Sequence, residues 1–171
     1  ASAINGSISC NGGTTTLTIS ASGGTAPYIG TGTFAVNAGP YSYTVTDANG
    51  CSTNINGNIG QPNALTASAL TGSINCYGGS TTATVFALGG TAPYSGIGIF
   101  TVYAGPYSYT VTDANGCSTS VSGSITQPNA LTASALNGSI NCNGGTTTVN
   151  VSALGGTAPY SGIGSFTASA G

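Results

Sequence analysis

The side chains that could do chemistry in this chain are five cysteines and two aspartates. The cysteines are Cys10, Cys51, Cys76, Cys117 and Cys142, and Asp47 and Asp113 are the only acidic residues, in a chain without lysine, arginine or histidine. A serine or cysteine nucleophile needs a neighbouring base. The aspartates lie 66 positions apart in matching sequence contexts, so no acid–base pair falls within one segment. The sequence therefore predicts a protein that is not an enzyme, with no catalytic or cofactor-binding residue and no cofactor.

Metal binding is disfavoured by the same inventory. The cysteine spacings are wide and no histidine is present, which argues against zinc. Asp47-Ala48-Asn49-Gly50 resembles part of an oxygen-rich calcium loop, but a single carboxylate is a poor cage for an ion that takes six to eight oxygen ligands. We favour the alternative that each aspartate caps its own turn, and we predict no metal site.

The absence of cations also limits the partners. Nothing in the chain can neutralise phosphates, so nucleic acid is excluded as a partner, and anionic membrane surfaces are excluded for the same reason. No apolar run approaches the roughly 18 residues that span a bilayer, so we expect no membrane insertion in this segment. No signal-peptide pattern opens the chain, and any export signal or anchor is expected outside it.

The chain repeats itself with a period of 66 residues. Ala1-Ser2-Ala3-Ile4 recurs as Ala67-Ser68-Ala69-Leu70, and Gly39 to Cys51 returns unchanged as Gly105 to Cys117. We therefore divide the chain into repeat 1 (1–66), repeat 2 (67–132) and repeat 3 (133–171), the third being truncated before its last hairpin. Units of this size bury only about 60% of their unfolded surface, so covalent or intermolecular support is expected.

Within a repeat, apolar residues alternate with polar ones. Tyr41, Tyr43 and Val45 alternate with serine and threonine, which predicts a half-buried strand. The turn residues 47–50 follow, and a second alternating run over 51–59 completes a hairpin. Leu17 and Ile19 mark another strand. We expect six or seven short strands per repeat and no helix, which makes each repeat an all-β, sandwich-like unit. The link 61–67 is short and contains proline, so we expect it to hold neighbouring repeats at a restricted angle and the repeats to form a rod.

The spacing of the cysteines favours pairing within a repeat. Cys10 would bond Cys51 and Cys76 would bond Cys117, which leaves Cys142 unpaired because its mate would lie beyond Gly171. A disulfide closing such a loop is worth about 4 kcal/mol in the chain-entropy model, and it implies an oxidising, extracellular compartment. Two alternatives stay open: a bond between Cys51 and Cys76 across the link, or free buried thiols.

Two further sets of residues are candidates for contact with sugars. One is a platform of tyrosine rings on which sugars could stack, made of Tyr41, Tyr43, Tyr107 and Tyr109. The alternative is that these residues form tyrosine corners, in which each hydroxyl is hydrogen-bonded to the backbone. The other is a set of N-glycosylation sequons at Asn5, Asn137 and Asn150. Sugars on serine or threonine would also protect a surface that carries almost no charge.

Several motifs together resemble the SprB-type repeats of Bacteroidota cell-surface proteins, which include the gliding-motility adhesins. They are Cys10-Asn11-Gly12-Gly13, the segment from Gly23 to Tyr28, the segment from Ala38 to Cys51, and Gln61-Pro62, with a second full set in repeat 2. The resemblance covers essentially the whole chain. It implies a secreted, filamentous protein built from tandem immunoglobulin-like repeats.

The sequence thus predicts a structural segment of an extracellular filament or stalk, at the cell surface, serving as a fibre or an adhesin spacer. The expected partner is the protein itself, through end-to-end repeats, a longer chain or strands donated by a neighbour. An alternative is an adhesin whose repeats bind surface polysaccharide directly. A third hypothesis is ice binding by threonine rows such as Thr14, Thr16 and Thr18.

Overall fold

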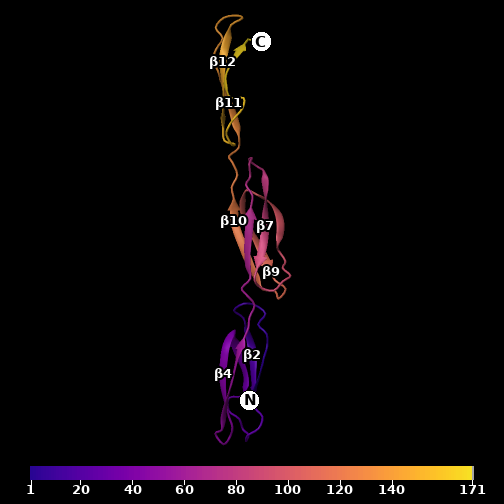
Figure 1. Cartoon of the computed structure of the whole chain (residues 1–171). Coiled ribbons are helices and arrows are strands. Elements are labelled where there is room, and N and C mark those ends of the chain that lie inside the picture. The colour runs from indigo at the N-terminus through magenta and orange to yellow at the C-terminus, as the bar shows by residue number, and fades with distance from the viewer. Residues whose placement is uncertain (171) are drawn as a thin grey trace. The chain divides into compact units, whose positions relative to one another are not determined.

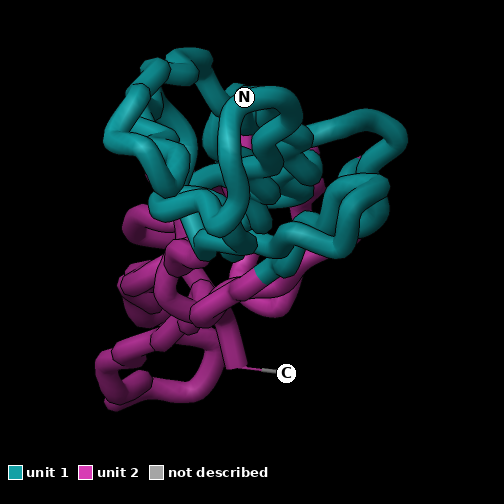
Figure 2. Tube along the Cα trace, turned by 90° about the horizontal axis from the view of Figure 1, so that it is seen from below, with its two compact units in different colours: residues 1–68, 86–97, 109–121 teal, residues 69–85, 98–108, 122–171 magenta. Residues whose placement is uncertain are grey.

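The computed structural model describes residues 1–170, and in that range it is all-β, with thirteen strands and no helix (Figure 1). Two compact units can be distinguished, and each is described by itself (Figure 2). Unit 1 comprises residues 1–68, 86–97 and 109–121, and unit 2 comprises residues 69–85, 98–108 and 122–171. These limits differ from the 66-residue sequence repeats, whose boundaries remain a prediction.

Unit 1 begins with a three-stranded antiparallel sheet. Its strands are β1 (Ser2–Asn5), β2 (Thr14–Ser20) and β3 (Gly32–Asn37), in the order β1-β2-β3. The alternation in β2 has the predicted effect: Leu17 and Ile19 are 0% and 2% exposed, whereas Thr16 and Thr18 face solvent. Strand β2 is therefore the central strand of the sheet and the main source of its core.

A hairpin supplies the other side of this core. Strands β4 (Gly39–Thr46) and β5 (Ser52–Ile59) pair in antiparallel register and are joined by residues 47–51, which confirms the predicted hairpin. Val45 is 4% exposed and forms a cluster with Leu17 and Ile19, against which Tyr41 and Tyr43 pack. Sheet and hairpin meeting over one apolar core are consistent with a β-sandwich.

The same order of elements continues along the chain. Strands β6 (Thr66–Thr71), β7 (Ser80–Leu88) and β8 (Gly98–Tyr103) form a second sheet, and β9 (Gly105–Thr112) and β10 (Ser118–Ile125) form a second hairpin. The apolar residues buried in unit 2 include Ala83 and Val85 of β7. Strands β11 (Thr132–Asn137), β12 (Thr146–Leu154) and β13 (Gly164–Ser169) form a third sheet.

The expected six or seven strands per repeat were too many. Residues 1–65 hold five strands and one isolated bridge, between Ile29 and Thr46. The segment Gly23–Tyr28 turns a corner through two glycines with positive φ and a cis Ala26–Pro27 bond. Directly after it, where an edge strand was expected, Ile29 makes only this bridge. Proline cannot donate to a strand ladder, which limits pairing there.

The third sheet has far less apolar packing than the first. Every residue of β11 is exposed, and Phe166 of β13 is 48% exposed, whereas Phe34 at the matching place in β3 packs against the core of unit 1. In the part of the chain that the structure describes, no hairpin follows β13. In the described structure, β11 and Phe166 are therefore more exposed than β1 and Phe34 are in unit 1.

Across residues 1–170 there is no helical segment with the length and apolarity that a membrane crossing requires.

Candidate functional site

The disulfide of this chain differs from the predicted pairing. Cys10 is bonded to Cys117, with a Cα–Cα distance of 5.7 Å, so the predicted bonds Cys10–Cys51 and Cys76–Cys117 are wrong. The bond joins the first sequence repeat to the second, because its two cysteines are separated by 107 positions. Both residues belong to unit 1.

The physical reason lies in the direction of the strands. Cys10 precedes the first residue of β2, where its carbonyl oxygen accepts a hydrogen bond from the backbone N–H of Gly13. Cys51 lies at the other end of β2, in a groove that Ala21 and Ser22 also line. Seven residues of strand separate these ends by about 20 Å, whereas disulfide Cα atoms lie within about 7 Å of each other.

The other three cysteines are free and exposed: Cys51, Cys76 and Cys142. The alternatives of a Cys51–Cys76 bond and of buried free thiols are therefore wrong as well. Cys142 carries a free thiol, as does Cys76 at the matching place in repeat 2.

Asp47 organises the turn that carries Cys51. Its Oδ1 accepts hydrogen bonds from the backbone N–H groups of Asn49 and Cys51, each 2.9 Å long, and its Oδ2 accepts one from Thr25 at 3.1 Å. The bond to Asn49 is the predicted Asx turn. Asp113 makes the same three bonds in repeat 2, to Asn115, Cys117 and Thr91. Each aspartate therefore fixes the position of the cysteine four residues later.

These hydrogen bonds lower the pKa of both carboxyl groups. The backbone N–H groups of Thr25 and Cys51 are the main cause for Asp47. Burial alone would raise the pKa of Asp113, but the N–H groups of Thr91 and Cys117 outweigh it and the pKa is lowered. Donors aimed at a carboxylate favour its charged form. A carboxylate held in this way is a weak base and already has its oxygens occupied.

We expect the two aspartates to set the acid stability of the protein. Because each folded-state pKa lies below the unfolded value of about 3.9, the stabilisation is complete above that pH and is lost as the pH falls through the folded-state pKa. Denaturant unfolding measured at a series of pH values should show a constant free energy of unfolding near neutrality and a decline below about pH 4.

The double variant Asp47→Asn/Asp113→Asn is the control for this prediction. The chain has no other acidic side chain, so the decline should disappear in this variant. The variant should also be less stable at neutral pH, since an amide NH₂ replaces one oxygen that accepts from a backbone N–H. A decline of unchanged size in the double variant would contradict this assignment.

The link between repeats 1 and 2 is held by hydrogen bonds at several points. The Gln61 Oε1 accepts from the backbone N–H of Gly12 at 2.7 Å, and the Pro62 carbonyl accepts from the Asn11 side chain at 3.0 Å. The Asn63 carbonyl accepts from the backbone N–H of Gly90 at 2.8 Å. We call residues 61–65 linker 1; it is bound by residues of both repeats, all within unit 1.

The link after repeat 2 makes corresponding bonds within unit 2. The Gln127 Oε1 accepts from the backbone N–H of Gly78 at 2.7 Å, and the Asn129 carbonyl accepts from that of Gly156 at 2.8 Å. The role of these glutamines was missed in the sequence. The signal that could have found it is the recurrence of a Gln-Pro pair together with a Gly-Gly loop near the start of each repeat.

Next to linker 1, the disulfide is part of a larger contact, which we call the junction. Besides the bond itself, the Asn115 side chain donates to the Ser9 carbonyl at 2.9 Å. Cys10 and Cys117 line a groove together with Ala64 and Leu65 of linker 1. The junction therefore combines one covalent bond, neutral hydrogen bonds and linker 1, and none of these contacts is an ion pair.

The predicted tyrosine platform is largely part of the core. Tyr41 and Tyr43 are half-buried against it, and the rings of Tyr43 and Phe34 lie 4.7 Å apart. Tyr41 pairs across the hairpin with Gly57, where an added Cβ would collide with the tyrosine ring. Such a ring covers the gap that a strand glycine leaves. Tyr107 covers Gly123 in the same way, and Tyr109 lies two residues further along β9.

Three further tyrosines have hydroxyls bonded to the backbone. Tyr28 donates to the Gly23 carbonyl at 2.8 Å, Tyr94 donates to that of Gly89 at 2.7 Å, and Tyr160 donates to that of Gly155. These bonds close the Gly-Gly-Thr-Ala-Pro-Tyr corners. The kind of bond that the tyrosine-corner interpretation predicted is therefore present at Tyr28, Tyr94 and Tyr160, which lie outside the predicted set.

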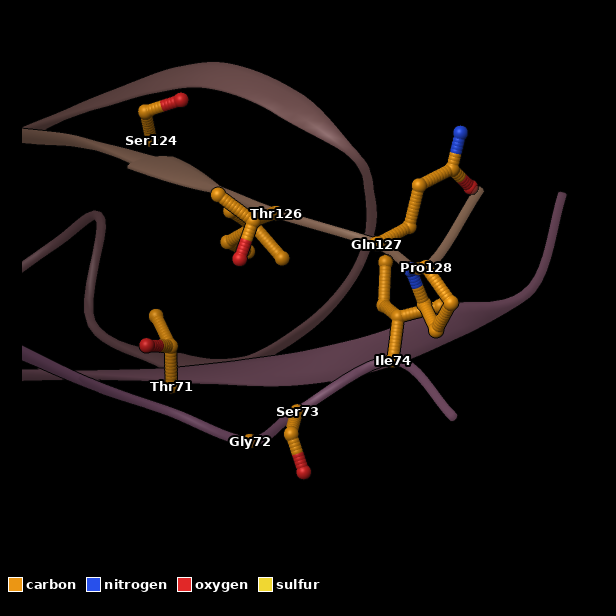
Figure 3. Close-up of a pocket in the computed structure, with 9 residues that line it drawn as sticks. Thr71, Gly72, Ser73, Ile74, Ser124, Thr126, Gln127 and Pro128 are labelled. Carbon is orange, nitrogen blue, oxygen red and sulfur yellow. The ribbon is translucent and has the colours of Figure 1, made fainter. Parts of the chain in front are cut away.

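The grooves of the molecule contain few groups that could do chemistry. One of about 430 Å³ in unit 2 is shown in Figure 3. Thr71 and Thr126 lie on its two sides, while the Ser73 hydroxyl points away from it. No titratable residue lines this groove. A second groove, of about 200 Å³ in unit 1, contains Asp47 and Cys51, but the carboxylate accepts from the backbone N–H of Cys51 rather than from its thiol.

The three asparagines of the sequons are all exposed. Asn5 and Asn137 end strands β1 and β11, and Asn150 lies within β12, where its Oδ1 accepts a hydrogen bond from the Ser165 hydroxyl. Their glycosylation stays a prediction.

Among residues 1–170, no three of the metal-ligating side chains gather into a group that could hold an ion. No protein-family model matches the chain, and no curated protein is significantly similar to it. The likeness to SprB-type repeats therefore depends on the sequence motifs alone.

Proposed function

We propose that this protein is a structural segment of an extracellular filament or stalk, in which small β-sandwich repeats act as a spacer at the cell surface. The observation that carries the proposal is the way linker 1 is held. It is hydrogen-bonded to Gly12 of repeat 1 and to Gly90 of repeat 2, and a disulfide locks the junction beside it. A linker that is bound on both sides restricts the angle between the repeats, whereas a free, flexible linker does not.

The chemistry of the surface supports the same function. The chain carries no cation and only two carboxylates, both occupied by backbone N–H groups. Its exposed strand positions are mainly serine and threonine, as in β4 and β9. Such a surface offers neither steering for charged ligands nor an acid–base pair for catalysis. The function of the protein would then depend on its length and stiffness. The disulfide fits an oxidising compartment.

Electron microscopy of the purified protein under non-reducing conditions tests this proposal. The expected result is threads with a regular axial repeat, and a persistence length that falls when Gln61→Ala and Gln127→Ala are combined, because the linkers lose their side-chain acceptors. Thr110→Ala is the matched control, since its hydroxyl bonds only Ser120 on the neighbouring strand. Separate compact particles, or threads as stiff in the glutamine variant as in the parent, would contradict the proposal.

A further inference from the structure

Strand β8 has one edge that no strand of the described residues 1–170 covers. It lies at the end of the sheet β6-β7-β8, so β7 is its strand partner on one side only. The Thr82 carbonyl of β7 accepts from the backbone N–H of Gly72, which places the backbone groups of Thr82 on the β6 side. Residues of an antiparallel pair alternate between bonding that partner and facing away from it. Thr101, which is paired with Thr82, therefore directs its N–H and C=O to the open edge.

The same alternation gives three residues of β8 whose backbone groups face outward. Ile99 and Tyr103 lie two positions on either side of Thr101, so their N–H and C=O groups also point to the open edge. Their side chains lie on the outer face of the sheet, where Ile99 is 73% and Tyr103 is 66% exposed. The open edge therefore combines three sets of backbone donors and acceptors with two large apolar side chains.

Strand β8 has none of the features that usually prevent such an edge from pairing. Edge strands are commonly protected by lysine, proline or a bulge. The six residues of β8 include neither a charged residue nor a proline, and the chain has no lysine. The register with β7 runs without a bulge from Tyr103 to Gly98. An uncharged strand rich in β-branched and aromatic residues, with open backbone groups, is a template for another strand.

The corresponding strands of the other repeats lack the apolar pair. Strand β3 also lies at the end of its sheet, but it has Thr33 and Asn37 where β8 has Ile99 and Tyr103. Strand β13 has serine at both places. Isoleucine and tyrosine are enriched in strands, whereas asparagine is depleted. The apolar edge is therefore particular to β8, and β3 offers a control within the same chain.

We propose that β8 pairs with β8 of a second copy of this chain, antiparallel and centred on Thr101, so that two three-stranded sheets become one. In this register Thr101 faces Thr101 of the second copy, and Ile99 of each copy faces Tyr103 of the other. Each of these three residues then donates one backbone hydrogen bond to the other copy and accepts one.

The side chains favour a second copy as the partner because the edge is complementary to itself. Ile99 and Tyr103 lie at equal distances from Thr101, so the two-fold pairing forms two identical contacts between a β-branched and an aromatic side chain. Such cross-strand pairs are favourable, and like charges facing each other are not. Neither copy presents a charge on this strand. A partner of another kind would need its own matching strand, whereas each copy already carries one.

This contact goes beyond the proposed spacer function, because it joins copies through a sheet edge and not through a linker. One strand from each copy forms a smaller interface than the standard size of about 1,600 Å². We therefore expect a reversible dimer that dissociates on dilution.

Substitutions at Thr101 test both the contact and its register. Thr101→Lys and Thr101→Glu each place like charges opposite each other at the centre of the pair, whereas a mixture of the two places opposite charges there. Sedimentation of the chain is measured up to about 1 mM protein, which reveals even a weak association. The free cysteines are replaced by serine in every sample, so that no disulfide joins the copies. The parent should dimerise, each variant alone should be monomeric, and their mixture should dimerise. Ala35→Lys, at the matching place in β3, is the control and should dimerise like the parent.

A second variant tests the side chains without adding charge. Ile99→Thr/Tyr103→Asn gives β8 the outer residues of β3, which already forms a strand with them. The dissociation constant should rise about tenfold, because both cross-strand pairs are lost. A monomeric parent over the whole concentration range would overturn the proposal, as would a Thr101→Lys variant that dimerises like the parent or a charge-swapped mixture that stays monomeric. In threads the same contact would join neighbours laterally, so unpaired threads of the parent would refute the pairing and leave the spacer function standing.

Discussion

Replacing Cys117 with serine is expected to lower the stability of the protein by about 5 kcal/mol, the loss that the chain-entropy model gives for opening a loop of roughly 100 residues. The residues joined by the bond are 107 positions apart, so the cross-link limits the unfolded chain over most of its first two repeats. For a chain of this length the midpoint of thermal unfolding should fall by roughly 15 °C. Calorimetry under non-reducing conditions measures this change in the unfolding midpoint.

The free cysteines provide controls of the same chemistry. Cys51→Ser and Cys76→Ser replace exposed thiols that bond nothing, so each should leave the midpoint unchanged. Addition of a reductant should bring the parent protein to the midpoint of Cys117→Ser and leave that variant where it was. If Cys51→Ser were as destabilising as Cys117→Ser, the pairing within repeats would be restored and the junction would be refuted.

Gly30→Ala is expected to destabilise the protein by about 3 kcal/mol, through strain and a backbone collision together. Gly30 has a φ of +88°, which an L-residue adopts only at a cost of about 1 kcal/mol. In addition, an added Cβ would collide with the carbonyl oxygen of Thr44. The close approach of Gly30 to Thr44 allows Ile29 to form its bridge with Thr46. In the alanine variant this corner must move away from the hairpin to make room for the Cβ.

Gly50→Ala separates the two causes. Gly50 has a φ of +83°, but an added Cβ there meets nothing within 4 Å. The free energy of unfolding of this variant should therefore fall only by the cost of placing alanine at a positive φ, about 1 kcal/mol. Denaturant unfolding of both variants gives the comparison, and equal losses would show that the contact with Thr44 is not the cause.

The local structure was predictable because its signals are local. The alternation around Leu17 and Ile19 places one face of β2 in the core, and the turn chemistry of residues 47–50 places the hairpin. Both depend only on neighbours in sequence. The Asx turn of Asp47 followed from the same kind of information.

The disulfide was not predictable in this way. Cys10 and Cys51 are close in sequence, but their distance depends on which end of β2 each loop reaches, and that is decided by how sheet and hairpin stack. The same limit applies to Gln61, whose acceptor role appears only when the end of β5 lies next to the loop of Gly12. The 66-residue period shows that the repeats are similar, but it does not show which residues of one repeat contact the next, because those contacts depend on three-dimensional packing.

The junction joins its partners through a sulfur bridge and through amide, carbonyl and N–H groups, none of which carries a net charge. Mobile ions weaken attractions between charges, at separations beyond about 10 Å in 0.1 M salt, and they have little to act upon here. The connection between repeats should hold equally well in fresh water and in brine, so that salinity would alter neither the length of such a thread nor its resistance to bending.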